Sequence, residues 1–350
     1  MSLSESAFSL VKEEEIDLLL ELSGSKSTKI KYSNSLEMID YKASLMREIK
    51  SKAVLDIKYP ITNYSSNIID LYGNRISYRY AREGVIFKTD QLFPVFYPFS
   101  NLSINEDSGE FGAFISNAQA GMASIFHFLN KLYNEVVIER ANQKIFFDSQ
   151  NILNSIKMRG EKNKFLLIDS SVADFSVYEN IELDGFAGFI FDNTCFSQNN
   201  PVFEAYLTKL VKTGKVVFLI KSLIKTDTLG VEFSHLGSLY ITNLNSLSNC
   251  DYNLQKELPE FTRRFFSSCG IYAGLDQWFP FYWNRKFFEL NEKRLTRMKN
   301  NLLETNTFLA NLELQESRGI HYHGLFNLFE IQDTEKNLYK MSYLILLIAS

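Results

Sequence analysis

Three short apolar runs in the middle of the chain each lead into polar or charged residues. Residues 165–168 precede Asp169, residues 188–191 precede Asp192, and residues 216–220 precede a Ser-x-x-Lys segment. Apolar runs of this length, separated by stretches with helical spacing, predict strands buried on both faces of a parallel sheet. Because parallel strands end at one edge, the sequence predicts that these polar residues lie together at that edge.

The order of these patterns predicts an α/β fold with a mostly parallel sheet in a large domain. A long charged helix over 281–309, two short strands and a final helix would form a smaller C-terminal α+β domain. Residues 7–23 and 36–52 have helical spacing and predict an N-terminal arm. We therefore divide the chain into residues 1–60, 61–255 and 256–350. Other predicted elements are strands at 111–116, 136–138 and 236–242, helices at 121–132, 146–158 and 201–213, and irregular chain at 59–82 and 92–100.

Composition excludes several classes of protein. The 350 residues suffice for a large core, and the net charge of −4 offers no basic surface for nucleic acid. Three scattered cysteines predict neither a disulfide framework nor a Cys-x-x-Cys metal site, as expected in a reducing cytoplasm. The N-terminus lacks the basic and apolar regions of a signal peptide. The last apolar run, 343–349, is too short to cross a bilayer.

Three segments place potential binding or reactive groups at the predicted edge. Small residues at 116–122 precede a helix, so their amide groups could bind a phosphate. Asp192 ends a strand, where a carboxylate can hold an aromatic nitrogen in its protonated form. Lys225, three residues after Ser222, follows an apolar strand, where partial desolvation makes a lysine nucleophilic. An acid and a lysine at one sheet edge are the groups that pyridoxal phosphate (PLP) chemistry requires.

Each segment also has a simpler structural explanation. The small residues at 116–122 can be an ordinary helix cap, and Asp192-Asn193 can be a turn. Lys225 can be a surface lysine. The other lysines that compete for its role are Lys212, Lys215 and Lys221. The order of phosphate loop, strand-end aspartate and Ser-x-x-Lys is more specific than any of its parts.

This order resembles the fold-type-I PLP-dependent enzymes, the aspartate aminotransferase superfamily. The resemblance covers about residues 60–335 and includes features of the aminotransferase and cystathionine synthase branches. Residues 120–125, Ala-Gly-Met-Ala-Ser-Ile, are similar to the Ser-Gly-Met-Ala-Ala-Ile loop of the second branch. Residues 222–225, with Gly230 and 236–237 after them, are similar to the Ser-x-x-Lys segment.

The resemblance implies a role for each matching residue. Lys225 would form the Schiff base with PLP, Asp192 would contact the pyridine nitrogen, and Ser222 would bind the phosphate. It also implies a large PLP-binding domain, an amino-acid substrate and a cytoplasmic homodimer without membrane or nucleic-acid partners. The further cofactor-binding candidates are Ala120, Gly121, Met122, Phe146, Phe147, Asp169 and Thr194, with either Phe placed over the cofactor ring.

The sequence also departs from the family pattern. The family often has an arginine a few residues beyond the lysine, where His235 is the only cationic candidate at 230–235. No arginine follows residues 324–326 to hold a substrate carboxylate, and Arg318 before them is a weak substitute. These departures leave open a PLP-dependent lyase or synthase acting on cysteine- or methionine-type substrates, or a non-catalytic relative. Transamination is the first expectation.

Other signals point to structure more than to chemistry. His321 and His323 share a strand face but lack a third metal ligand, so packing is favoured and no metal is expected. Cys195 is expected to be a small buried residue. A tyrosine-rich segment (Tyr72, Tyr78 and Tyr80) could reach a partner's active site or pack on the surface. No G-x-G-x-x-G or Walker A segment follows an early strand, which lowers the alternative of a nucleotide binder.

Overall fold

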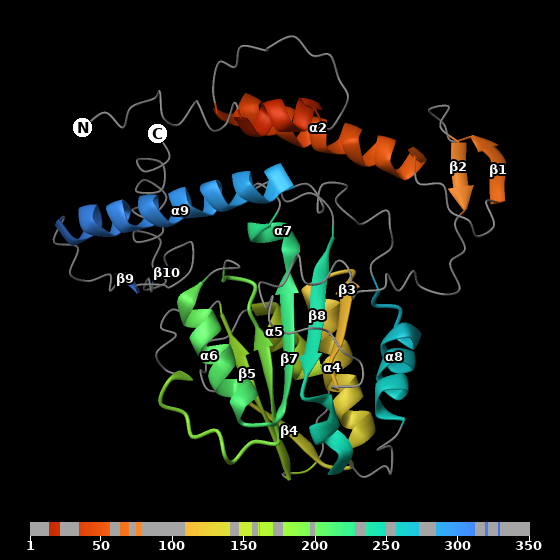
Figure 1. Cartoon of the computed structure of the whole chain (residues 1–350), viewed down its shortest axis with the longest axis vertical. Coiled ribbons are helices and arrows are strands. Elements are labelled where there is room, and N and C mark those ends of the chain that lie inside the picture. The colour runs from red at the N-terminus through yellow and green to blue at the C-terminus, as the bar shows by residue number, and fades with distance from the viewer. Residues whose placement is uncertain are drawn as a thin grey trace.

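The computed structural model shows an α/β protein built on one mixed sheet (Figure 1). The residues that it describes are 14–21, 35–56, 64–69, 75–78, 109–140, 147–155, 160, 162–170, 178–196, 200–227, 235–249, 257–272, 285–311, 319–320 and 328–329. None of the helices in this part of the chain is long and apolar enough to cross a membrane.

The sheet has six strands in the order β3-β8-β7-β6-β5-β4. The strands β4 to β7 are parallel, and β8 is antiparallel to both of its neighbours, β7 and β3. The bounds are β3 Phe111–Ile115, β4 Val136–Arg140, β5 Asn163–Asp169, β6 Gly188–Asp192, β7 Val216–Ser222 and β8 Gly237–Thr242. The mostly parallel α/β sheet predicted from the sequence is therefore confirmed.

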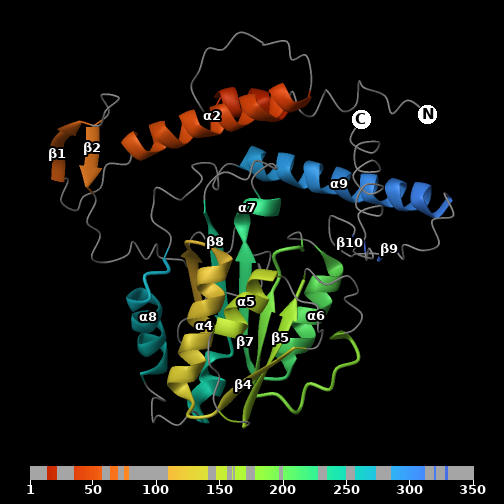
Figure 2. The same ribbon diagram turned by 180° about the vertical axis from the view of Figure 1, so that it is seen from behind.

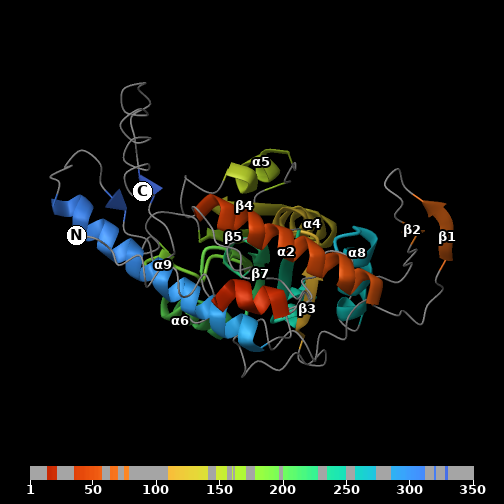
Figure 3. The same cartoon turned by 90° about the horizontal axis from the view of Figure 1, so that it is seen from above.

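Each face of the sheet is covered by helices, as the apolar strand runs predicted. On one face pack α4 (Ala118–Leu132) and α8 (Leu258–Ser268). On the other face packs α6 (Pro201–Lys212), and the helical residues 14–21, α2 (Ser35–Asp56) and α9 (Arg285–Asn311) add buried side chains to the same apolar cluster. Seen from above, α2 and α9 cross over the sheet, and α5 (Phe147–Ser155) lies on the α4 side (Figure 3). Because α8 packs with α4 on the sheet, this α/β unit includes residues beyond 255.

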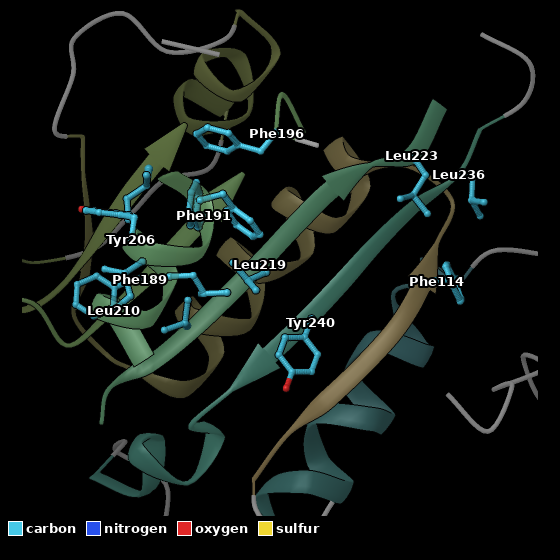
Figure 4. Close-up of a cluster of buried hydrophobic side chains, with 14 of the residues drawn as sticks. Phe114, Phe189, Phe191, Phe196, Tyr206, Leu210, Leu219, Leu223, Leu236 and Tyr240 are labelled. Carbon is cyan, nitrogen blue, oxygen red and sulfur yellow. The ribbon is translucent and has the colours of Figure 1, made fainter. Parts of the chain in front are cut away.

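Strand β7 shows why these apolar runs form the centre of the fold. Val217 and Leu219 belong to the cluster on the α6 face, whereas Val216, Phe218 and Ile220 belong to the cluster on the α4 face. All five side chains are buried. Burial of each large apolar side chain contributes about 1.5–3 kcal/mol, so β7 is fixed from both sides. Figure 4 shows Leu219 beside Phe189, Phe191 and Tyr240 on the α6 face.

Most predicted elements are present, with bounds that differ by a few residues. One prediction was wrong. Within 59–82 the structure has an antiparallel pair, β1 (Tyr64–Ile69) and β2 (Arg75–Tyr78), where irregular chain was expected. Turn-forming residues between 69 and 75 are as compatible with a hairpin as with a loop. Residues 92–100 and the predicted final helix lie outside the described residues. Strands β9 (Gly319–Ile320) and β10 (Leu328–Phe329) fall within the two short strands predicted at 319–323 and 325–331.

Helices α2 and α9 lie beyond the upper end of the sheet (Figures 1 and 2), and two salt bridges join helix 14–21 to α9. Lys286 pairs with Glu21 at 3.1 Å, and Lys293 pairs with Glu14 at 3.2 Å, both at exposed positions. Between helix 14–21 and α2, Glu15 and Lys42 form a buried pair. The predicted N-terminal helices therefore pack on the same layer as α9, over the edge at which β5, β6 and β7 end.

Candidate active site

Asp169 and Asp192 stand side by side at the ends of β5 and β6. They are paired residues in the parallel register of these strands, and the amide of Ser170 donates to the carbonyl oxygen of Asp192 at 2.9 Å. Asp169 is only 1% exposed. The sheet thus brings two carboxyl groups to one edge, as the sequence predicted.

The alternation of side chains along strands places the polar residues on defined faces. Asp192 is two residues after Ile190, and Ser222 is two residues after Ile220, and both isoleucines face α4. Asp169 likewise follows Leu167 on that face. Because side chains in a strand alternate with a period of two, the three polar residues lie on the α4 face. By the same rule Lys221 faces the opposite side.

The surroundings of Asp192 disfavour the ionised form of its carboxyl group. Burial and, after it, repulsion by Asp169 raise the pKa of Asp192 from 3.8 to about 6. Two hydrogen bonds from Thr194 and the nearby charge of Lys225 act in the opposite direction but are the weaker contributions. A positively charged group placed against Asp192 would therefore be strongly favoured.

Thr194 connects the ends of β6 and β7. Its amide donates to Oδ1 of Asp192 at 3.0 Å, and its hydroxyl oxygen accepts the amide of Ser222 at 2.9 Å. The residue is only 5% exposed. Thr194 thus fixes the orientation of the aspartate and its distance from the Ser-x-x-Lys segment, as a structural member of the site.

Ser222 ends β7 and is the N-cap of the single-turn helix α7 (Leu223–Thr226). Its side chain makes no hydrogen bond to the helix, and Lys225 lies at an exposed position in the same turn. Lys221 is only 4% exposed and pairs with Asp227 at 3.1 Å. Lys221 is therefore buried and paired, whereas Lys225 is exposed and its charge acts on Asp192.

The loop before α4 reaches the same edge through Gly237. A Cβ on Gly237 would lie 3.0 Å from the amide nitrogen of Ala118 and 3.0 Å from the carbonyl oxygen of Lys221. In the sheet Gly237 pairs with Ile115 on one side and Ser222 on the other. Only a glycine lets the start of α4 approach the end of β7 this closely.

The first turn of α4 is closed by a side-chain cap. Asn117 accepts the amide of Ala120 at 2.7 Å on its side chain and the amide of Gly121 at 3.2 Å on its carbonyl oxygen. Met122 is buried. The amide groups of Ala120 and Gly121 therefore already have acceptors, and the start of α4 presents the positive end of a helix, which favours an anion.

Other predicted site residues are not positioned by the structure. Phe146, Arg318, His321 and His323 lie outside the described residues, and so do Tyr72 and Tyr80. Phe147 is the first residue of α5. No group of three or more residues suited to metal binding occurs in the described part of the chain.

Three residues of this edge were missed by the sequence analysis. Ser170 is fully buried and accepts the amide of Cys195 on its hydroxyl at 3.0 Å. The hydroxyl of Tyr178 accepts the amide of Asp169 at 3.0 Å. Gly237, noted only as part of a motif, sets the approach of α4. Ser170 follows directly on Asp169 and was detectable, whereas Tyr178 reaches the site from another segment.

Cys195 is a small buried residue, as predicted from the sequence. It is 3% exposed, and burial together with the charge of Asp192 raises the pKa of its thiol to about 12. A thiol with so high a pKa is neutral at physiological pH and is a poor nucleophile. Cys195 is therefore a packing residue of this edge.

No protein-family model matches the sequence, and the search of curated proteins found no match. Solved structures are similar. The aromatic amino acids aminotransferase of Psychrobacter sp. B6, cocrystallised with aspartic acid, has 10% identity and a TM-score of 0.53 over 90% of this chain and 84% of its own. The chain therefore shares the fold of this aminotransferase.

Two further structures are similar at lower scores. The aromatic-amino-acid aminotransferase of Burkholderia pseudomallei, covalently bound to pyridoxal phosphate, has 12% identity and a TM-score of 0.44 over 83% of this chain and 79% of its own. The broad specificity aminotransferase of Leishmania mexicana has 11% identity and a TM-score of 0.44 over 85% and 80%.

Proposed function

We propose that the protein is a PLP-dependent aminotransferase that acts on an amino acid. The observation that carries this proposal is the pairing of Asp192 with Lys225. A partly buried carboxyl group of raised pKa and an exposed lysine influence each other electrostatically at the ends of neighbouring strands. The aminotransferase fold supports the same reading.

The residues of the edge fit the cofactor. When bound, PLP supplies an electrophilic carbon for amines and an aromatic ring that accepts electrons from the substrate. Asp192 is suited to its protonated ring nitrogen, because a cation there relieves the repulsion from Asp169. The start of α4 and the hydroxyl of Ser222 are suited to its phosphate. Phe146 or Phe147 would cover the ring.

The acid–base chemistry is assigned to Asp192 and Lys225. With a pKa near 6, the carboxyl group of Asp192 is mostly ionised at neutral pH, and an adjacent cation keeps it so. The Nζ of Lys225 would bind the cofactor covalently and, once released, carry the proton of the substrate Cα. Thr194 would hold Asp192 in position through its amide. Arg318 is the proposed contact of the substrate carboxylate.

The wider setting belongs to the same proposal. We infer a cytoplasmic homodimer that has no membrane or nucleic-acid partner, with an N-terminal arm, a large cofactor-binding domain and a small C-terminal domain. Light scattering of the purified protein tests the dimer, because a mass of one chain in solution would contradict it.

The first experiment is covalent capture of PLP. The purified protein is mixed with PLP, reduced with borohydride, digested and analysed by mass spectrometry. We expect a reduced adduct on Lys225 and none in Lys225→Ala. The matched control is Lys212→Ala, which removes another exposed lysine and leaves capture unchanged. Capture equally spread over surface lysines, or absent from the wild type, would contradict the proposal.

A second experiment identifies the reaction. The protein with PLP is incubated with single amino acids, with and without a keto acid acceptor. Transamination yields a new amino acid from the acceptor, whereas elimination yields ammonia and a keto acid without one. Product formation that needs the acceptor supports the aminotransferase, and ammonia release points to the lyase alternative.

A further inference from the structure

A buried ion pair closes the turn that carries Lys225. Lys221 comes directly before Ser222, and Asp227 is two residues after Lys225. Their side chains meet at 3.1 Å, and both residues are at most 5% exposed. The chain between them forms the single turn α7. A four-residue helix has too little intrinsic stability to hold a defined position.

The backbone of this turn is also anchored at its start. The amide of Ser222 donates to the hydroxyl of Thr194 at 2.9 Å, and the amide of Leu223 donates to the carbonyl oxygen of Leu236 at 3.0 Å. At the far end of the turn, the Lys221–Asp227 pair ties the chain back to β7. Lys225 lies between these two anchors.

Arg294 of α9 extends the pair toward the N-terminal helices. Its charge interacts with Asp227 on one side and with Glu15 on the other, and Glu15 in turn pairs with Lys42 of α2. Burial lowers the pKa of Arg294, and the two carboxylates partly offset this effect. Among the described residues, its Nη1 is buried without a hydrogen-bond partner. Its placement is therefore governed by charge.

We propose that Lys221 and Asp227 are positioning residues that hold the Lys225 turn against the end of β6, and that the charge of Arg294 on α9 supports Asp227 in this role. Lys221 and Asp227 fix the turn at both ends, and Arg294 holds Asp227 from the α9 side. This inference rests on the proposed function for the role of Lys225, but the placement of the turn can be measured without PLP.

The experiment is hydrogen exchange of the protein without cofactor, resolved to peptides that cover 222–227. In Asp227→Asn we expect exchange of these amides to rise on the order of tenfold or more, because loss of the pair frees the turn to open locally. Peptides of α4 and β6 should not change. Asp227→Glu keeps the charge and should restore protection.

A second measurement concerns the chemistry. The rate of PLP capture at Lys225 should fall roughly 10- to 100-fold in Asp227→Asn, since displacement of a reacting group by about 1 Å has effects of this size. Arg294→Gln should give a smaller decrease. The matched control is Glu14→Gln, which breaks the exposed Glu14–Lys293 pair between the same two helices and should leave both readouts unchanged.

Two outcomes are distinguished by further variants. Where Asp227→Asn does not fold, the double variant Lys221→Met with Asp227→Leu removes both charges and is expected to fold. Unchanged exchange over 222–227 in the variant that folds overturns the inference. Absence of PLP capture in the wild type overturns the proposed function instead, and the exchange result still decides whether the pair positions the turn.

Discussion

The two faces of the sheet edge treat buried charge in opposite ways. On the α4 face, Asp169 and Asp192 lie side by side, and their repulsion contributes to the raised pKa of Asp192. On the other face, Lys221 and Asp227 form a close pair of opposite sign. Both clusters lie at neighbouring strand ends, and Asp169, Lys221 and Asp227 are buried, whereas Asp192 is partly buried. The two aspartates on the α4 face would be stabilised by a bound cation, whereas Lys221 and Asp227 already neutralise each other.

This difference separates a binding site from its support. Proteins neutralise buried charges with partners when stability alone decides, because an uncompensated charge costs several kcal/mol. Like charges kept together at a strand end reduce stability and indicate a functional site. The balanced pair next to it keeps the Lys225 turn in place.

The largest expected effect on stability is at the buried Lys221–Asp227 pair. Lys221→Met leaves the carboxylate of Asp227 buried without its ion-pair partner and should lower the free energy of unfolding by about 3–5 kcal/mol. Lys225→Ala, at an exposed position, should change it by less than about 0.5 kcal/mol. Urea unfolding of both variants measures the contrast. Equal losses would mean that the two lysines do not differ in structural role.

On the α4 face, removal of a charge is expected to increase the free energy of unfolding rather than lower it. The pKa of Asp192 is raised from 3.8 to about 6, so its ionisation lowers stability above pH 6 and has no effect below pH 4. Asp192→Asn should therefore increase the free energy of unfolding at pH 7.5 by about 3 kcal/mol, at 1.36 kcal/mol per pKa unit. The variant should also lose capture of PLP.

The pH dependence supplies the control for Asp192. Between pH 4 and 6 the wild type should lose stability as pH rises, and Asp192→Asn should lack this slope. Asp169→Asn should reduce the slope, because it removes the repulsion. A variant that is less stable than the wild type at pH 7.5 would show that Asp192 is paired more favourably than we infer.

A smaller effect on stability is expected at Gly237, where the start of α4 approaches the end of β7. Gly237→Ala would place a Cβ 3.0 Å from two backbone atoms, which cannot move as a flexible side chain does. We expect a loss of about 1–3 kcal/mol and weaker binding of PLP through displacement of the α4 start. Gly185→Ala, with nothing within 4 Å of its added Cβ, is the matched control. Equal stability of the two variants would contradict the close approach.

The smallest effect is expected at the exposed pair. Glu14→Gln breaks its salt bridge to Lys293, in which both side chains are about half exposed. Exposed pairs contribute about 0–1 kcal/mol, so stability should hardly change. A loss comparable to that of Lys221→Met would show that the contact between helix 14–21 and α9 depends strongly on this exposed pair.

Local patterns in the chain were sufficient for the sheet and for part of the site. The apolar runs before Asp169, Asp192 and Lys221 specified buried parallel strands, because few other structures bury every side chain of so short a segment. Strand ends of a parallel sheet meet at one edge. Asp192, Ser222 and Lys225 were therefore predictable as neighbours, as was a helix at 121–132, although α4 begins three residues earlier, at Ala118.

Contacts between distant segments decided the rest. Nothing near Lys221 in the sequence shows that it is buried, that Asp227 neutralises it, or that Arg294 lies behind the pair. The same holds for Tyr178 on Asp169 and for Gly237 against Ala118. A hairpin replaced the irregular chain predicted at 59–82 because turn residues do not reveal strand pairing. Burial, charge compensation and close backbone approach depend on which segments pack together, and the order of residues alone leaves that packing open.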